Sequence, residues 1–390
     1  MKGAGHEVEI LWRGRRVHAF VPDALRSRDL ELDAPTATRV GAAAAAIVHA
    51  AEALGPDIEV LARLLLRSEG VASSYVEGVT APIVDVVLAE EHFVDKSDSA
   101  AWVASNLAAI DEALASATKE SPLSVSTVCS WHRILMTGSP TPARHVGVMR
   151  EEQGWIGGTS PLDAHLVTPP PAALPQLMDD LIDYANRTDV DPIVQAAVGH
   201  AQFVLIHPFA DGNGRIGRIL SVWLLIRRLR LVVPPPLSVS VAADVGGYTS
   251  GLVLFRIGDH NAWIRWFCDA VVAGGNTQQA LISSVERMQE RWQAKVKSGE
   301  RKLRSDATAL RTLEVLPRHL ILTSKVLADE LKVTRKTAIA ALQRLVDAGI
   351  LWDYGSLEGI GRGPRSRLYV SPELLGLAGS RPLSRVTSVE

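Results

Sequence analysis

Two apolar segments, at 194–206 and 219–229, flank the polar stretch His-Pro-Phe-Ala-Asp-Gly-Asn-Gly-Arg-Ile-Gly-Arg at positions 207–218. The apolar residues of both segments are typical of buried helices. The polar stretch is therefore predicted to be a loop between two central helices, and the second helix is predicted to start near Gly214. This feature constrains the fold most, because it places a histidine, a carboxylate and two arginines at the N-terminal end of a buried helix.

The glycine-rich middle of this loop is suited to binding an anion. The backbone N–H groups of Gly212, Asn213 and Gly214 can turn toward one anion, because glycine adopts backbone conformations that other residues resist. A helix N-terminus already favours negative charge. Arg215 and Arg218 are three residues apart, so their guanidinium groups share one helix face and can pair with phosphate oxygens. Each feature alone is usually a plain turn or a solvated face, and their fixed order favours a phosphate site.

Two further side chains of the same loop are candidates for a metal ligand and a general base. Asp211 is a carboxylate placed to hold Mg²⁺, which commonly takes one or two carboxylates together with substrate phosphates. His207 titrates near neutral pH and could take a proton from a hydroxyl group. The stretch therefore predicts a nucleotide phosphate site with a base beside it.

The stretch resembles, position by position, the His-Pro-Phe-x-Asp/Glu-Gly-Asn-Gly-Arg-x-x-Arg signature of the Fic family, whose members transfer AMP from ATP to a protein hydroxyl. The resemblance implies His207 as general base, Asp211 as magnesium ligand and residues 212–214 as the cradle for the α- and β-phosphates. It also implies phosphate contacts from Arg215 and a γ-phosphate contact from Arg218. Because the Gly-Asn-Gly-Arg part is complete, the resemblance favours AMP transfer over transfer of another group.

A second segment, from Ser73 to Gly78, resembles the Ser/Thr-x-x-x-Glu-Gly/Asn inhibitory helix of the same family, with Glu77 as its glutamate. Read alone, it is a short helix that closes at Gly78 and carries a solvated glutamate. In relatives this glutamate pairs with the last arginine of the signature, here Arg218, and takes the place that the γ-phosphate needs. The resemblance implies that Glu77 inhibits transfer, and it leaves open a second activity in which Glu77 positions a water for AMP removal.

Residues 147–171 are rich in glycine and proline and predict a hairpin that contains Trp155, Ile156, Gly157 and Gly158. The hairpin resembles the flap that lies over the Fic active site and holds the target by strand-like pairing. The alternative is a surface hairpin whose Trp155 packs against the body. Tyr248 follows the family's usual downstream pattern and is a candidate for the adenine pocket.

The C-terminal part predicts two helices, 325–331 and 335–348, and then strands that start at 349 and 366. This order resembles the winged-helix domains of bacterial regulators. Acidic residues dilute its basic face, so an interaction or dimerisation role stands beside DNA binding. The candidates for DNA contact are Thr334, Arg335, Lys336, Gln343 and Arg344, with Arg362, Arg365 and Arg367 on the wing.

Composition narrows the class of protein. A chain of 390 residues with 47% hydrophobic and 22% charged residues predicts two or three well-packed domains. The net charge of −2 gives no global attraction to nucleic acid or membrane. Cys129 and Cys268 lie in apolar helical sequence without metal-ligand spacing, which predicts buried free thiols and a reducing cytoplasm. We expect neither export nor a membrane span.

The remaining sequence predicts helices after an N-terminal hairpin at 7–12 and 16–20. His132 is predicted to be a packing histidine. The expected helices are 36–54, 57–67, 68–78, 82–91, 99–117, 124–135, 174–186, 192–206, 215–229, 248–254, 262–272 and 278–298.

These observations predict an all-α protein, with a Fic helical core, a β-hairpin flap and a C-terminal winged helix-turn-helix. The predicted parts are an N-terminal segment 1–95 with the inhibitory motif at 73–78, a catalytic core 96–275, a linking helix 276–304, a winged helix 305–375 and a tail 376–390. The predicted activity is AMP transfer from magnesium-ATP to Ser, Thr or Tyr of a protein target, the chain itself being one candidate. The family resemblance alone implies a homodimer. The alternative is a nucleotide-sensing DNA-binding transcriptional regulator.

Overall fold

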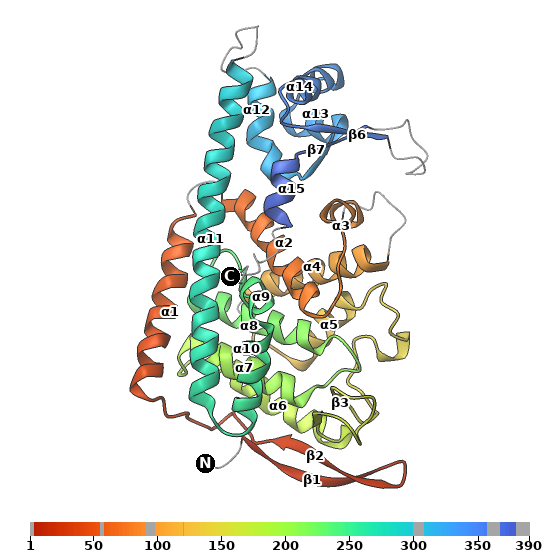
Figure 1. Ribbon diagram of the computed structural model, residues 1–390, viewed down its shortest axis with the longest axis vertical. Coiled ribbons are helices and arrows are strands. Elements are labelled where there is room, and N and C mark those ends of the chain that lie inside the picture. The colour runs from red at the N-terminus through yellow and green to blue at the C-terminus, as the bar shows by residue number, and fades with distance from the viewer. Residues whose placement is uncertain are drawn as a thin grey trace, which may run out of the picture.

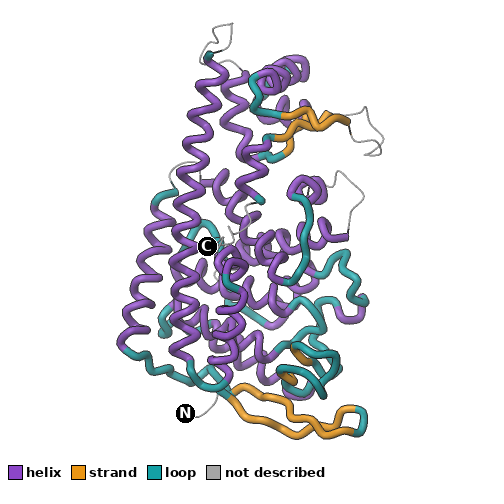
Figure 2. Tube along the Cα trace, in the orientation of Figure 1, coloured by secondary structure: helices purple, strands orange, loops and turns teal. Residues whose placement is uncertain are grey.

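The computed structural model describes residues 4–54, 58–90, 98–119, 121–298, 308–356 and 367–379. Helices make up most of these residues, and the strands form three small sheets, at the N-terminus, in the flap and in the C-terminal domain (Figures 1 and 2). The predicted all-α class is confirmed.

Helices α7 (Pro192–Ile206) and α8 (Asn213–Leu229) form the centre of the molecule and are buried over nearly their whole length. Helix α7 begins at Asp191, whose Oδ1 accepts the N–H groups of Ile193 and Val194 at 2.8 and 3.2 Å. A helix that is apolar on all sides must be enclosed by others. The enclosing helices are α1 (Ala34–Glu52), α4 (Asp98–Ala117), α5 (Val125–Leu135), α6 (Leu174–Ala185), α9 (Leu237–Ala243) and α10 (Val245–Arg256).

Two long helices differ from the prediction. Helix α2 (Ile58–Val76) is continuous where separate helices at 57–67 and 68–78 were predicted. Its polar middle is buried rather than turned out, and Gly70 packs so closely on α4 that an added Cβ would lie 2.3 Å from Leu107. Helix α11 (His260–Lys297) also has no break, because Gly275 allows the close approach of α1 at Ala46. The predicted domain boundary at residue 275 therefore lies inside a helix.

Antiparallel pairs form the two sheets near the flap. Strands β1 (Gly5–Trp12) and β2 (Arg15–Pro22) make the predicted N-terminal hairpin, and β3 (Trp155–Ile156) pairs with β4 (Leu166–Val167) in the flap. Helix α9 follows the prolines at 234–236 and was not predicted.

The C-terminal domain contains the predicted helix-turn-helix, α13 (Ser324–Leu331) and α14 (Arg335–Asp347), between α12 (Thr308–Val315) and α15 (Pro372–Ala378). Its sheet has the order β5-β7-β6, with β5 (Ile321–Thr323), β6 (Trp352–Ser356) and β7 (Arg367–Val370). Strand β5 was not predicted, and β6 begins later than the predicted residue 349. The rest of the wing, with Arg362 and Arg365, and most of the predicted tail lie outside the described residues.

Helix α2 belongs to two cores at once. Leu61, Leu64 and Leu65 in its first half share one hydrophobic cluster with Leu327, Leu342 and Leu374 of the C-terminal domain. Its second half reaches α8, where Ser73 accepts hydrogen bonds from Arg218. Helix α3 (Ile83–Glu90) lies beside it and also contacts α15 (Figure 1). The C-terminal domain is therefore packed directly on the helix that carries the predicted inhibitory motif.

Within the part of the chain that the structure describes, no single helix has the length and apolar character needed to cross a membrane. One pair, Leu237–Ala243 with Val245–Arg256, meets both criteria jointly but is bent by 99°.

Candidate active site

His207 ends helix α7 in a left-handed conformation, with φ 52° and ψ 57°. Its Nδ1 lies 3.3 Å from the carbonyl oxygen of Val204, so the proton is assigned to Nδ1 and Nε2 remains a proton acceptor. Burial lowers the pKa of His207 to about 4, which outweighs the opposing effect of the hydrogen bond to Val204. The imidazole is therefore neutral at pH 7 and able to act as a base.

The loop after His207 is held by side chains of its own and of α5. Asn213 accepts the N–H of Phe209 through Oδ1 at 2.9 Å and donates to the carbonyl of Phe209 through Nδ2 at 2.8 Å. His132 stacks on Phe209 with ring centroids 3.9 Å apart, accepts the N–H of Gly147 at Nδ1 and lies 3.1 Å from the carbonyl of Asp211. The prediction of a packing role for His132 is confirmed. The Asn213 side chain is committed to the loop, so only its backbone N–H remains for an anion.

The first turns of α8 contain the predicted anion site. Gly212 is the N-cap with φ 75°, and its N–H is already donated to Asp211 Oδ1 at 2.6 Å. Arg215 and Arg218 are both at least nine-tenths buried. Their Nε and Nη1 atoms, respectively, have no hydrogen-bond partner among the described residues. A buried guanidinium without a partner is costly, and a phosphate oxygen at this helix end would satisfy it.

The carboxylate of Glu77 occupies part of this anion site. Its Oε1 accepts Arg218 Nη2 at 2.8 Å and lies so near Gly214 that a Cβ there would be 2.2 Å from it. Ser73 also binds Arg218: its Oγ accepts a hydrogen bond from Nε at 3.0 Å, and its carbonyl oxygen accepts one from Nη2 at 2.9 Å. Burial is the largest effect and opposes the charged guanidinium, but Glu77, Tyr248 and Glu69 together outweigh it, so the pKa of Arg218 is raised. Gly78 then ends the segment with φ 76°.

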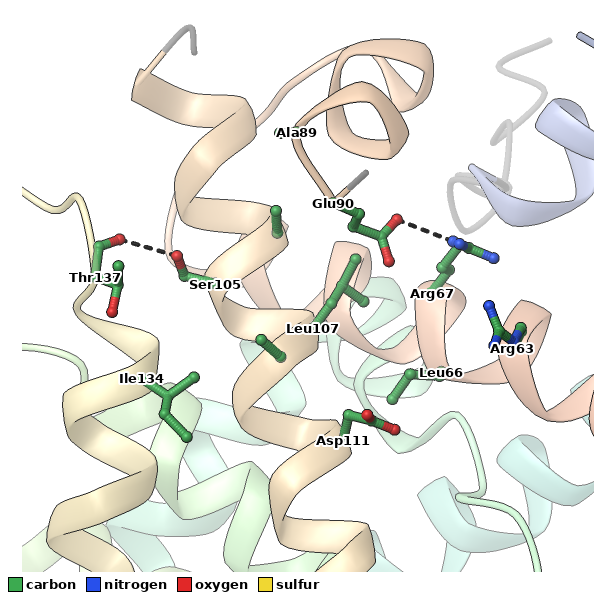
Figure 3. A pocket seen from close by; sticks show the side chains of 12 residues that line it. Arg63, Leu66, Arg67, Ala89, Glu90, Ser105, Leu107, Asp111, Ile134 and Thr137 are labelled. Atoms are coloured by element: carbon green, nitrogen blue, oxygen red, sulfur yellow. Dashed lines mark hydrogen bonds and ion pairs between the residues drawn. The ribbon is translucent and has the colours of Figure 1, made fainter. Parts of the chain in front are cut away.

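Two further contacts anchor helix α2 on the N-terminal side of Ser73. Glu69 accepts the N–H of Ser238 at 2.6 Å and also its hydroxyl, and burial raises the pKa of Glu69 to about 7. Arg67 donates to Glu90 at 3.0 Å across a cavity of about 440 Å³ between α2, α3, α4 and α5 (Figure 3). The half of α2 that carries the predicted inhibitory motif is therefore bound to α8, α9 and α3.

Asp211 carries the carboxylate predicted to bind magnesium, and its side chain is 58% exposed. Arg215 Nη2 lies 4.0 Å from its Oδ1. In the described ranges no three His, Cys, Asp or Glu residues cluster as a metal site. One carboxylate beside an anion site fits Mg²⁺ whose other oxygens come from nucleotide phosphates and water.

Arg150 connects the flap to the loop and was missed by sequence reasoning. It is buried, and its Nε donates to the carbonyl of His207 at 2.8 Å. Its Nη2 donates to Thr168 Oγ1 at 2.9 Å and to the carbonyl of Pro169 at 2.7 Å. Burial lowers the pKa of Arg150 to about 10, so it stays charged at pH 7. An arginine in a loop does not belong to the apolar spacing of a helix or strand, so the sequence did not single it out. Only the folded structure shows that Arg150 connects the two loops.

Of the four predicted flap residues, Trp155 lines a cavity that also contains His207. This cavity of about 220 Å³ is lined by Arg150, Gln153, Trp155, His207 and Phe209. Gly157 and Gly158 both have φ 69°, and added Cβ atoms would lie 2.6 Å from His165 and 2.5 Å from the carbonyl of Asp163. The glycines are therefore required for the turn. Ile156 pairs with Leu166 across the hairpin.

Tyr248, the adenine-pocket candidate, lies on α10 close to Arg218. It is 8% exposed, and its hydroxyl lies 2.9 Å from His200 Nε2. It lines a cavity of about 20 Å³ together with Arg218, Trp263 and Trp266. The structure therefore places Tyr248 beside the γ-phosphate candidate within an aromatic cluster.

The DNA-contact candidates are partly committed within the C-terminal domain. Thr334 caps α14 by accepting the N–H of Thr337 at 3.2 Å, and Arg335 Nε donates to Ser324 Oγ at 3.2 Å. Arg367 pairs with Asp353 at 2.7 Å, whereas Lys336 is exposed. Of these contacts, only the pair of Arg367 with Asp353 reduces the positive charge available to a DNA backbone, because Arg335 donates to a neutral hydroxyl and keeps its charge.

Residues 122–225 match the model of the Fic/DOC family. A protein adenylyltransferase fic-1 from Caenorhabditis elegans is 30% identical over 149 residues, which are 37% of this chain and 26% of that protein. A probable protein adenylyltransferase from Aquifex aeolicus is 39% identical over 59 residues, which are 15% of this chain and 18% of that protein. The chain thus spans about a quarter or less of the length of these relatives.

Solved structures show the same fold. A Fic family protein from Desulfovibrio desulfuricans G20 has a TM-score of 0.55 at 20% identity, over 88% of this chain and 98% of that chain. Fic-1 from Caenorhabditis elegans has a TM-score of 0.53 at 19% identity, over 64% of this chain and 74% of that chain.

Proposed function

Because the chain contains a Fic domain at residues 122–225, we propose that it transfers AMP from ATP to a hydroxyl group of a protein target. One observation carries the proposal. The neutral imidazole of His207 precedes one short loop, and the first two turns of α8 after that loop carry guanidinium atoms of Arg215 and Arg218 that have no hydrogen-bond partner among the described residues. A base and an anion site in this order suit attack of a hydroxyl on a phosphate.

The reaction follows from these positions. His207 Nε2 takes the proton of a Ser, Thr or Tyr hydroxyl, and the oxygen forms a bond to the α-phosphorus of ATP. The bond from that phosphorus to the oxygen bridging the α- and β-phosphates breaks, and pyrophosphate leaves. Backbone N–H groups at 213–214 and the two arginines stabilise the negative charge on the phosphates without reorganising. Asp211 would hold Mg²⁺, which neutralises phosphate charge when bound.

Autoinhibition is part of the proposal. Glu77 lies on Arg218, the candidate γ-phosphate ligand, so ATP and Glu77 compete for one guanidinium. ATP that binds without Arg218 would not place its α-phosphate for in-line attack. The contact also keeps Glu77 near the site, which leaves AMP removal as a second activity of the same residue.

Intact-protein mass after incubation with magnesium-ATP tests the proposal on the wild type, on Glu77→Gly, and on Glu77→Gly with His207→Ala. We expect only the single variant to gain the mass of AMP. If no variant gains mass, labelled ATP in a cell lysate is the second trial. Absence of labelled protein there contradicts transferase activity.

The cellular compartment and the oligomeric state are also part of the proposal. Both cysteines are free, which supports a reducing cytoplasm, and a homodimer is proposed from the family resemblance alone. Light scattering after size-exclusion chromatography measures the oligomeric state. The rival function, a DNA-binding regulator, is supported by the helix-turn-helix but disfavoured by an intact His207, since sensing a nucleotide requires no base.

A further inference from the structure

The N-terminal hairpin, β1–β2, lies beside the flap. Strand β2 contacts β4, and the hairpin runs below the flap at the lower edge of the molecule (Figure 1). Arg256 joins the two, because its Nη1 donates to the carbonyl of His165 at 3.2 Å and its own carbonyl accepts the N–H of Ala4 at 3.1 Å. Hairpin and flap therefore present one joint surface.

The tip of the hairpin reaches the entrance of the active site. The ring of Trp12 meets the ring of Trp155 edge to face, with centroids 6.5 Å apart. Trp155 in turn lines the cavity that contains His207. A target segment that enters this cavity over the flap therefore passes the hairpin tip.

The hairpin tip is exposed and cationic. Leu11 is 74% exposed, and the turn Trp-Arg-Gly-Arg-Arg at 12–16 contains three exposed arginines and no acidic residue. Arg13 lies over the Trp12 ring at 4.7 Å, and Arg16 Nε lies 3.5 Å from Glu9. The hairpin is held by its inner face at Val17 and Ala19, so the core does not require the charged tip.

The charged residues that line the groove between hairpin and flap are Arg16, Arg256 and Glu7, so two positive charges and one negative charge give a net formal charge of +1 with the histidines neutral. The groove has a volume of about 640 Å³. On the flap side, Asp163 does not line the groove, and its carboxylate accepts the N–H and hydroxyl groups of Thr159 and Ser160 at 2.7–2.9 Å. The polar side chains that line the groove are His6, Glu7, Arg16, His18, His165 and Arg256.

We propose that the β1–β2 hairpin is a target-recognition element, which selects protein segments with acidic residues next to the modified hydroxyl. This inference rests on the proposed function, because it assigns the target class of the same site. Glutamates or aspartates of the target pair with Arg13, Arg15 and Arg16 while the hydroxyl lies at His207. Exposed charge pairs contribute mainly to selection and encounter, so the effect falls on target binding rather than on the chemical step.

The test uses two peptides with one threonine and one tyrosine each, flanked by glutamates in one and by lysines in the other. Full-length Glu77→Gly protein is assayed with labelled ATP. We expect about a tenfold preference in kcat/KM for the acidic peptide, from three exposed charge contacts. The preference should disappear when Arg13→Ala, Arg15→Ala and Arg16→Ala are added, because the KM for the acidic peptide rises while kcat stays unchanged. High salt reduces the preference in the parent protein.

A matched control removes the same charge elsewhere. Arg287→Ala, Lys295→Ala and Lys297→Ala change exposed residues toward the far end of α11, and the preference should persist. Equal modification of both peptides by the parent, or an unchanged preference in the hairpin variant, overturns the inference. If the parent gains AMP on itself but modifies neither peptide, the inference fails while the proposed function stands. If it neither gains AMP nor labels any lysate protein, the proposed function itself fails.

Discussion

Substitution of Glu77 by glutamine should raise the affinity for ATP but not for ADP. Glu77 Oε1 accepts Arg218 Nη2 at 2.8 Å, and the proposed γ-phosphate site is the same guanidinium. A hydrogen bond between charged groups contributes about 1.5–3 kcal/mol. The Glu77 side chain is 36% exposed, so the lower end applies, because solvent screens the pair. Removal of the charge should therefore strengthen ATP binding by about tenfold, which corresponds to about 1.4 kcal/mol.

Isothermal titration calorimetry measures this on a His207→Ala background, where turnover does not interfere. ATP and ADP are titrated with Mg²⁺ into that variant with and without Glu77→Gln. Glu152→Gln is the control, since Glu152 is an exposed carboxylate at the flap cavity. An equal gain for ADP and ATP, or the same gain in the control, would refute competition for Arg218 and indicate a general effect of charge.

Three further predictions concern protons and packing. Because burial lowers the pKa of His207 to about 4, kcat/KM of Glu77→Gly should stay level from neutral pH to about 5 and fall only as the imidazole becomes protonated, which a pH profile measures. The pKa of Glu69 is raised from 4.5 to about 7, so the folded state binds a proton that the unfolded state has lost, and stability should fall by up to about 3 kcal/mol as pH rises from 4.5 to 7. Urea unfolding should show that Glu69→Gln flattens this dependence. Leu374→Ala, in the core shared by α2 and the C-terminal domain, should lower the free energy of unfolding by about 2–5 kcal/mol. With Glu77 left in place, this variant should also add more AMP to itself than the wild type does, because a loosened α2 holds Glu77 less firmly on Arg218. Intact-protein mass spectrometry measures the added AMP, and no increase would contradict this prediction.

Local sequence determined much of the fold and the centre of the site. The bounds of α7 were predicted at 192–206, because the apolar spacing that predicts a helix acts within a few residues. The loop at 207–212 and its polar groups followed from the same reasoning. The pairing of Glu77 with Arg218 was implied by resemblance, whereas the segment read alone gave a solvated glutamate.

Only the tertiary structure decided what joins distant segments. Ser73 and Arg218 are 145 residues apart, and their contact depends on how α2 packs on α8. The continuity of α2 and α11 depends on neighbouring helices that enclose Gly70 and Gly275, because a glycine that breaks an isolated helix is retained where close packing favours it. Arg150 could not be predicted either, since its acceptors come from the flap and from the His207 loop. The spacing of apolar residues predicts which face of a helix is buried. It does not predict where a charged side chain is buried, because the partners of that charge come from distant segments that meet only when the chain folds.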